Sequence, residues 1–274
     1  PYPWESYSQI PVQDFMYGAM ENTTATVFGD FLFCDERSFL DKPYYSVNAH
    51  ELAHQWFGDF VTARSDAHHW LQESFATYYD WLFEKNYFGK EQFDWIKRTA
   101  QNNALDESAK NKYPVAHSEA GSVRHYPKGA FVLNMLKYVL GGREIYNKCI
   151  KHYLQQHPYS NVNTDDLLVA CEEVTGMQLD WFFEEWVYKG GEPSYKVTFR
   201  DITDDVSGKT PAHYSEFIVQ QTQEQSIITG LPESGKNKTN AVSNDPFVQE
   251  TGSSTPAPAG LWKMPIWLEV YYTD

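Results

Sequence analysis

The stretch that most constrains the fold is HELAHQWFGDFV at residues 50–61, which places two histidines four positions apart. Residues i and i+4 share one face of an α-helix, so a helix here aims the imidazoles of His50 and His54 at one point. Glu51 lies about 100° further around the helix axis, where it can reach a water molecule beside the pair but cannot be a close third ligand. The rest of the stretch is largely apolar, and buried histidines need partners. The sequence therefore predicts a buried helix over 44–57 that carries part of a metal site.

Two imidazole nitrogens leave a zinc ion short of its tetrahedral shell, so a third protein ligand is expected, with water in the fourth position. The candidate is Glu73, which falls in the next predicted helix, 69–88, on a largely apolar face where a buried carboxylate requires a cation. Four other residues are rival ligands: Asp59, Asp66, His68 and His69. His68 and His69 are interpreted as loop residues, because neighbouring side chains rarely face one metal. The alternative for the whole motif is an ordinary helix surface on which the histidines meet by coincidence.

Composition and charge narrow the class of protein. The chain has 274 residues, of which 42% are hydrophobic and 16% aromatic, and this is typical of a globular protein with a sizeable core. The net charge of −15 argues against nucleic acid or an anionic membrane as partner, and is compatible with a cationic ligand such as an amine. The three cysteines, Cys34, Cys149 and Cys171, match neither a disulfide framework nor a cysteine-based zinc site, so they leave the compartment open.

No stretch predicts a membrane-spanning helix, because the longest apolar segment, GAFVLNMLKYVLGG, is short and contains Lys137. The sequence does not begin with Met and ends directly after an apparent strand, so we expect a fragment of a longer protein. The lack of a signal peptide in this chain therefore leaves its localisation undecided.

The apolar pattern predicts two kinds of structure in the first part of the chain. Residues 1–35 are expected to be extended, because TATVFGDFLF is rich in β-branched and aromatic residues. From about 44 to 190 the pattern is mostly helical, with a long polar loop over 100–125 and a helix over 127–140 that has Pro127 in its first turn. Two further helices are predicted in TDDLLVACEEVTG and LDWFFEEWVYKGG.

The character of the sequence changes at GGEP, residues 190–193. Beyond it, YKVTFRDI and MPIWLEVYY alternate apolar and polar residues with period two, as half-buried strands do. Residues 222–260, between them, are rich in Ser, Thr, Gly, Asn and Pro and predict a flexible insertion. We therefore expect a domain boundary near residue 191, with one domain over 1–190 and a small β-rich domain over 191–274.

Four segments together resemble one known family. HELAHQWFGDFVT followed by ESFATYY is similar to the metal-binding segment of the zinc aminopeptidases of the aminopeptidase N and leukotriene A hydrolase type, which are gluzincins. YGAMEN at 17–22 matches the family's exopeptidase signature, YPKGAFVLNML is similar to its catalytic-tyrosine segment, and FFEEWVYKGGEP resembles the junction with a β-sandwich. The resemblance covers about residues 5–195. It implies an α+β fold: a thermolysin-like, mostly helical catalytic domain with an N-terminal β-sheet, followed by a β-sandwich-like domain.

The resemblance also implies a role for each matching residue. The implied ligands of one zinc ion are His50, His54 and Glu73. The implied catalytic residues are Glu51, as general base, and Tyr126, as hydrogen-bond donor to the oxyanion. The implied substrate-binding residues are Glu21, for the free α-amine, and the backbone of Gly18 and Ala19. These roles together predict a metallopeptidase that hydrolyses the N-terminal bond of peptides with a free N-terminus.

The match departs from the family pattern in two respects. Pro127 stands where an acidic residue is more usual, which the tolerance of proline at a helix start accommodates. The family's N-terminal domain and its large C-terminal helical domain are missing from this chain, so both are expected as parts of the longer protein.

Three other activities remain open from the sequence: a thermolysin-type endopeptidase, an epoxide hydrolase, and a catalytically silent scaffold. Glu21 in its motif argues against the endopeptidase, and no stretch indicates the lipid tunnel that an epoxide hydrolase of this kind needs. The presence of every implied ligand and catalytic residue argues against the silent scaffold.

Overall fold

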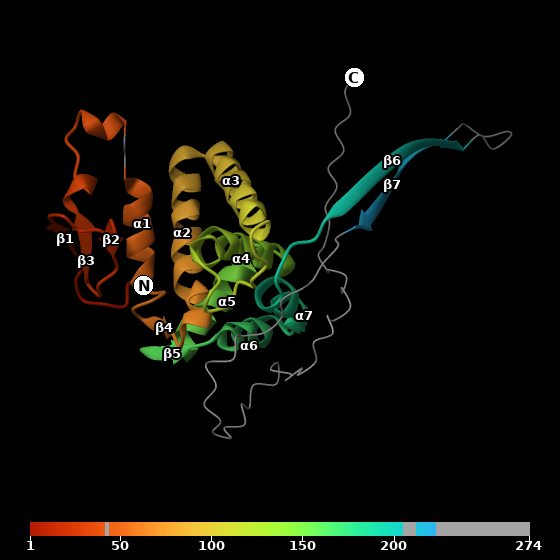
Figure 1. The fold of residues 1–274 in the computed structure, drawn as a ribbon. Helices are drawn as coiled ribbons and strands as arrows, with labels where there is room; N and C mark the ends of the chain where they lie inside the picture. Colours follow the sequence, from red (N-terminus) through yellow and green to blue (C-terminus); the bar gives the residue numbers. More distant parts are fainter. Residues whose placement is uncertain (42–43, 205–211, 223–274) are drawn as a thin grey trace.

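The computed structural model describes residues 1–41, 44–204 and 212–222. A small N-terminal sheet lies on one side of a body of helices, and a two-stranded hairpin extends from the other side (Figure 1). The fold therefore mixes helix and strand, with helix dominant from Tyr45 to Tyr188, as the sequence predicts. Among the described residues, no helix has the length and apolar character needed to cross a membrane.

The N-terminal sheet has three strands in the order β1-β3-β2: β1 (Ser8–Val12), β2 (Ala19–Met20) and β3 (Ala25–Gly29). The central strand, β3, is parallel to β1 and antiparallel to β2, and its sequence ATVFG places Thr26 and Phe28 in the interior. Two short 3-10 turns follow, at Asp30–Leu32 and Ser38–Leu40. Strands thus occur where the sequence predicts extended chain, and β2 is an edge strand among the described residues.

The described residues form seven α-helices: α1 (Tyr45–His54), α2 (Trp70–Phe88), α3 (Lys90–Ser108), α4 (Gly129–Val139), α5 (Arg143–Gln156), α6 (Thr164–Thr175) and α7 (Asp180–Phe183). Two π-helical turns adjoin them, at Arg124–Lys128 before α4 and Glu184–Tyr188 after α7. Two short parallel strands and a 3-10 turn complete the body: β4 (Val61–Ala63), β5 (Ser160–Val162) and η3 (Asp66–His68).

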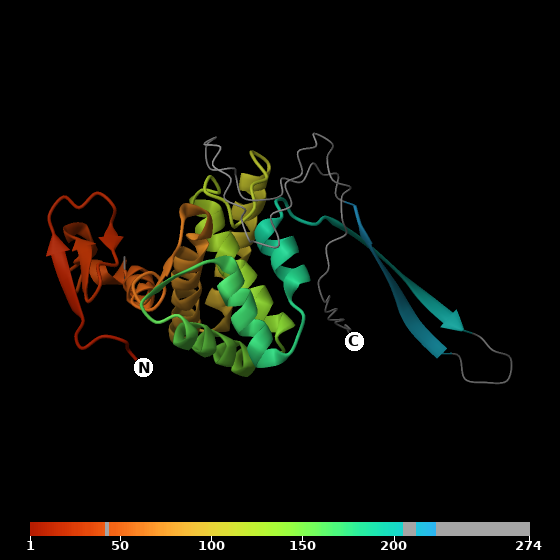
Figure 2. The ribbon, with the colours of Figure 1, turned by 90° about the horizontal axis from the view of Figure 1, so that it is seen from below.

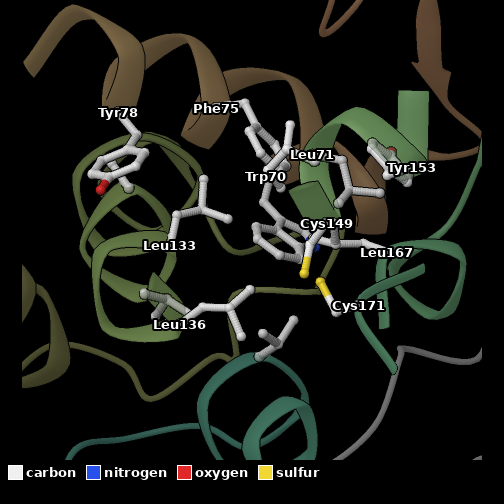
Figure 3. Close-up of a cluster of buried hydrophobic side chains, with 14 of the residues drawn as sticks. Trp70, Leu71, Phe75, Tyr78, Leu133, Leu136, Cys149, Tyr153, Leu167 and Cys171 are labelled. Carbon is white, nitrogen blue, oxygen red and sulfur yellow. The ribbon is translucent and has the colours of Figure 1, made fainter. Parts of the chain in front are cut away.

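The central helix of the body is α2, because it packs against α1, α3 and α4. Its residues Trp70, Phe75 and Tyr78 are fully buried, and they meet Leu133 and Leu136 of α4 in the hydrophobic core (Figure 3). Each side chain of this size contributes about 1.5–3 kcal/mol through burial. On its other side α2 faces α1, which lies between the N-terminal sheet and α2 in both views (Figures 1 and 2). The helix that carries HELAH therefore runs against a helix held firmly in the core.

The structure corrects the sequence prediction in the middle of the chain. The segment predicted as a loop over 100–125 is helical up to Ser108, in α3, and becomes helical again at Ser122, just before the π-helical turn. α3 buries only Phe93, Ala100 and Ser108, spaced about two helical turns apart, so its polar sequence carries little periodic signal. α5 is likewise absent from the prediction, whereas the predicted helix 69–88 corresponds closely to α2.

Beyond the helices, β6 (Tyr195–Asp204) and β7 (Ala212–Gln221) form an antiparallel hairpin. β6 contains the predicted strand YKVTFRDI, whereas β7 falls where no strand is predicted. The last predicted strand, MPIWLEVYY, and the predicted insertion beyond Thr222 lie outside the described residues. The domain boundary near 191 and the β-sandwich-like second domain therefore stay predictions.

Candidate metal centre

The side chains of His50 and His54 on α1 meet Glu73 on α2, where the two helices pack together. The Nε2 atoms of the two histidines are 3.1 Å apart, and Glu73 Oε2 lies 3.4 Å from the first and 3.3 Å from the second. The structure thus brings the three predicted ligands into one cluster. In the part of the chain that the structure describes, no other group of three potential ligands comes together in this way.

The spacing and chemistry of these three atoms fit a zinc ion. Zinc–ligand bonds of about 2.0–2.2 Å at tetrahedral angles separate neighbouring ligand atoms by about 3.3–3.6 Å, close to the distances in this cluster. Glu73 Oε2 is buried and accepts no well-formed hydrogen bond, which leaves its lone pairs for a cation. Burial opposes ionisation of Glu73, but the histidines around it outweigh burial and hold its pKa well below the usual range. Two imidazoles and a carboxylate are also a ligand set of catalytic zinc sites.

The C-terminal end of α1 orients His54. Its Nδ1 lies 2.8 Å from the carbonyl oxygen of Phe57, so Nδ1–H donates to that carbonyl and Nε2 keeps its lone pair for a metal. The turn beyond passes through Gly58, whose φ of 135° lies in a region that residues with a Cβ avoid. A Cβ on Gly58 would also come within 3.3 Å of His54 Nδ1. The glycine therefore allows the chain to turn back there, where the Phe57 carbonyl binds His54 Nδ1 and leaves Nε2 facing the cluster.

Glu51 follows the first histidine on α1 and is only 7% exposed. Burial raises the pKa of its carboxyl group to about 7, although the neighbouring His54 opposes the rise. Its Oε2 is buried without a hydrogen-bond partner in the structure. An unsatisfied carboxylate oxygen inside a site is available to accept a proton or a hydrogen bond from a ligand.

Tyr126 reaches the centre from a third element, the π-helical turn before α4. Its ring stacks on the ring of His50, with centroids 5.8 Å apart and planes 4° from parallel. Burial, and after it the charge of Glu73, raise the pKa of Tyr126 well above its usual range, so its hydroxyl keeps its proton. The predicted start of a helix at Pro127 is wrong, because the π-helical turn spans Arg124–Lys128 and contains the proline. Such local widening of a helix is frequent at functional sites.

Close packing of α2 against this turn sets the position of Tyr126. Ser74 Oγ donates a hydrogen bond to the carbonyl oxygen of His125 at 2.6 Å. Gly129 permits the approach, because a Cβ on this glycine would collide with Ser74 Oγ. The residue after Glu73 and the residue before Tyr126 are therefore joined directly.

Glu21 lies beside the centre, just after β2, with Oε1 3.9 Å from His54 Nδ1. Its segment is tied to α1 by Gln55, a fully buried amide. Gln55 Oε1 accepts from the Thr24 backbone N–H at 2.9 Å, and Gln55 Nε2 donates to the Glu21 carbonyl oxygen at 3.2 Å. The same Nε2 donates to Asp59 Oδ2 at 2.8 Å. The side-chain amide of Gln55, the residue after His54, thus binds both the Glu21 segment and Asp59.

Gly18 and Ala19 lie at the edge of the N-terminal sheet. Ala19 pairs with Phe28 of β3, and the Gly18 carbonyl oxygen accepts from the Gly29 N–H at 2.6 Å. Among the described strands β2 has a neighbour on one side only, so its other edge is open to pairing with an extended peptide.

The rival ligands have other roles. His68 is buried in η3, with Nδ1 2.9 Å from Thr164 Oγ1, whereas His69 places Nε2 3.1 Å from Glu73 Oε1. The two adjacent histidines diverge and lie in the short turn before α2, as the sequence argument expects, and each also makes a specific contact that the sequence did not indicate. Asp59 and Asp66 are not members of the metal cluster. Burial raises the pKa of Asp59 to about 7, and Gln55 binds its carboxylate.

Sequence reasoning missed Gln55 at this centre, and it considered His69 only as a rival ligand, not as a neighbour of Glu73. In both cases the sequence contains a feature that indicates the contact. Gln55 is a polar residue inside an apolar stretch that was already predicted to be buried, and such a residue must find partners. His69 stands four positions before Glu73, the spacing that brings side chains together on a helix.

Two imidazoles and one carboxylate that meet between two packed helices form the donor set of a zinc site. Residues 1–186 match the Peptidase family M1 domain, so the chain belongs to peptidase family M1. The family resemblance drawn from the sequence motifs is thereby confirmed.

Individual relatives agree with this assignment. Aminopeptidase M1-D of Oryza sativa subsp. japonica is 33% identical over 248 residues, which cover 86% of this chain and 27% of that protein. An M1 zinc metallopeptidase from Deinococcus radiodurans, solved as a mutant bound to a Tyr-Ser-Ala substrate, is 26% identical with a TM-score of 0.55, over 68% of this chain and 40% of that one. Native yeast LTA4 hydrolase is 26% identical with a TM-score of 0.60, over 70% and 33% of the two chains. The chain spans about a quarter of the length of the curated relatives it matches.

Proposed function

We propose that this chain carries the catalytic centre of a zinc-dependent aminopeptidase, which hydrolyses the N-terminal bond of peptides with a free α-amine. Membership of family M1 and the aminopeptidases among the relatives support the proposal. The observation that carries it is the position of Glu21, a carboxylate outside the ligand cluster whose Oε1 lies 3.9 Å from His54 Nδ1, the ring nitrogen opposite the one that faces the cluster. A carboxylate at this place suits an ammonium group beside the metal.

His50, His54 and Glu73 are the residues that would hold one zinc ion. When bound, zinc supplies a Lewis acid that polarises the scissile carbonyl and acidifies a water molecule. Glu51 accepts the proton of the attacking water and later donates it to the leaving amine. The Tyr126 hydroxyl donates a hydrogen bond to the carbonyl oxygen as negative charge develops on it.

Glu21 decides which bond reaches the centre. Its carboxylate pairs with the ammonium of the first residue, and this pairing sets the register of the peptide so that only the terminal bond lies at the metal. The open edge of β2, at Gly18 and Ala19, aligns the peptide through backbone hydrogen bonds. Loss of one partner from such a desolvated charge pair costs about 2–5 kcal/mol, so blocked peptides are poor substrates.

The test of the mechanism is Glu51→Gln, measured for zinc content and for hydrolysis of a free peptide by the zinc-loaded protein. The amide cannot accept the proton, so the variant keeps zinc and loses nearly all turnover. Glu144→Gln, at an exposed glutamate of α5 that pairs with Lys148, is the matched control. Retained turnover in Glu51→Gln removes the general-base role from Glu51. Zinc binding without turnover in the unmodified protein favours the silent scaffold.

A further inference from the structure

The two oxygens of the Glu73 carboxylate have different surroundings. Oε2 faces the histidine pair, at 3.4 Å from His50 Nε2 and 3.3 Å from His54 Nε2. Oε1 lies 3.1 Å from the Nε2 of a third histidine, His69. The family resemblance assigns no role to this histidine. One oxygen thus faces the two histidines of the cluster, and the other lies beside the third histidine.

Helix geometry makes the contact between His69 and Glu73 a fixed one. His69 has the backbone angles of an α-helix, φ −56° and ψ −24°, and directly precedes α2, so it stands four positions before Glu73 on a continuous helical turn. Its ring also contacts the ring of His125 edge to face, with centroids 5.6 Å apart. The imidazole is therefore held from two sides, by the carboxylate of α2 and by the turn that carries Tyr126.

We propose that His69 is a positioning residue of the metal centre: its Nε2–H donates to Glu73 Oε1 and thereby keeps Oε2 turned towards the metal. The inference rests on the zinc site proposed above. A carboxylate that is free to rotate about its last bond presents either oxygen, or both, to a cation. A hydrogen bond to one oxygen removes that freedom, and outer partners of this kind orient metal ligands generally.

A direct ligand role for His69 fits the geometry less well. Its Nε2 is engaged with Oε1, on the oxygen that is turned away from the histidine pair. It also stands outside the group of ligand atoms that lie within 4.8 Å of one another among the described residues.

The alternative is that His69 and Glu73 form an ordinary helix-surface pair that does not affect metal binding. Exposed pairs at this spacing contribute little, and the His69 side chain is itself 40% exposed. The partner differs from an ordinary surface partner, because the Glu73 side chain is 8% exposed and contacts both proposed histidine ligands. A change in the orientation of this one carboxylate therefore acts on the metal directly.

The experiment measures the zinc affinity of the whole chain by competition with a chromogenic chelator, for the unmodified protein and three variants. We expect His69→Ala to weaken zinc binding by about 10–100-fold, the range found when outer partners of metal ligands are removed. His69→Gln, whose side-chain amide also donates a hydrogen bond, should restore most of the affinity. His152→Ala, which removes a histidine–glutamate contact of 2.6 Å between α5 and α6, should leave it unchanged.

The zinc affinities of the variants decide whether His69 positions Glu73, binds the metal itself or has no effect on the metal. An affinity for His69→Ala equal to that of the unmodified protein overturns the proposal. If His69→Gln binds as weakly as His69→Ala while both zinc-free variants keep the circular dichroism and melting temperature of the unmodified protein, His69 acts as a ligand rather than through Glu73. The visible spectrum of the Co²⁺ form checks this independently, because a positioning residue leaves the number of ligands unchanged. Failure of the unmodified protein to bind zinc overturns the metal site itself, which is a separate result.

Discussion

The ring of Tyr126 lies parallel to the ring of His50, so the turn before α4 packs directly on a proposed zinc ligand of α1. The contact and the proposed chemistry use different parts of the tyrosine. The ring stacks on the imidazole, whereas the hydroxyl is the group that would donate to the oxyanion. Packing and catalysis can therefore be separated by removing the hydroxyl alone.

Tyr126→Phe should lower kcat by about 10²–10³-fold, the usual effect of losing one oxyanion donor. The stacked ring remains, so zinc affinity and KM should change little. Tyr138→Phe, at an exposed tyrosine of α4, is the matched control. Steady-state kinetics on a free peptide test the prediction, and an unchanged kcat would leave Tyr126 with a packing role only.

Zinc should stabilise the fold through Glu73. A ligand that binds only the folded state adds about 2.7 kcal/mol to the free energy of unfolding when its concentration is about 100 times its Kd. We therefore expect a chelator to lower the melting temperature of the unmodified protein and of an exposed control, Glu144→Ala. In Glu73→Ala the chelator should have little effect. A full chelator-dependent shift in that variant would point to a different third ligand.

Gln55→Leu should disturb the segment that presents Glu21. The leucine leaves the Thr24 N–H and the Asp59 carboxylate without their partner, a loss of at most about 1–3 kcal/mol for each of these half-buried groups. The free energy of unfolding should fall, and KM for free peptides should rise more than kcat falls. Gln101→Leu, on the exposed face of α3, is the control for the substitution itself. Equal KM values for both variants and the unmodified protein would show that Gln55 does not position Glu21 for substrate binding.

His125 should make the fold less stable in mild acid. Burial, and then the nearby His69, lower the pKa of His125 to about 4, although Glu73 and the His117 carbonyl oppose this. An unfolded histidine titrates near about 6.5, so between these values the unfolded chain binds a proton that the folded chain does not. The free energy of unfolding therefore falls as the pH is lowered from about 6.5 to about 4, by roughly 2–3 kcal/mol from this residue.

Urea denaturation of the unmodified protein and of His125→Gln, at several pH values between about 7 and 4, measures this contribution. The glutamine keeps a donor for the His117 carbonyl oxygen, which accepts from His125 Nε2 at 3.2 Å. The free energy of unfolding of the unmodified protein, minus that of His125→Gln, should increase as the pH is raised. Parallel pH profiles would show that His125 does not carry the effect.

The metal cluster was predictable because its geometry is local. His50 and His54 share a face of one helix, and Glu73 sits on the apolar face of the next, so helical spacing and burial alone suggest the three together. Glu51 follows from the same helix. The positions of Glu21 and Tyr126 depend on chain segments that are distant in sequence, and only the family resemblance indicated them.

The missed features have physical reasons. α3 buries a narrow stripe and is otherwise polar, so its helical period is hidden in the sequence. The π-helical turn at Arg124–Lys128 packs against α2 where Gly129 approaches Ser74, a tertiary contact that a proline near a helix start does not reveal. The contact of His69 with Glu73 is hidden in the sequence, because two adjacent histidines before a helix favour a loop interpretation although the spacing of four positions is helical.

The most direct test of the central claim follows one peptide with a free N-terminus and its N-acetylated twin by mass spectrometry, with the zinc-loaded protein and with Glu21→Gln. The account predicts stepwise loss of single residues from the free peptide, little cleavage of the acetylated one, and loss of this preference in Glu21→Gln. Internal cuts in both peptides by the unmodified protein would contradict it. They would show an endopeptidase, in which Glu21 has a structural role only.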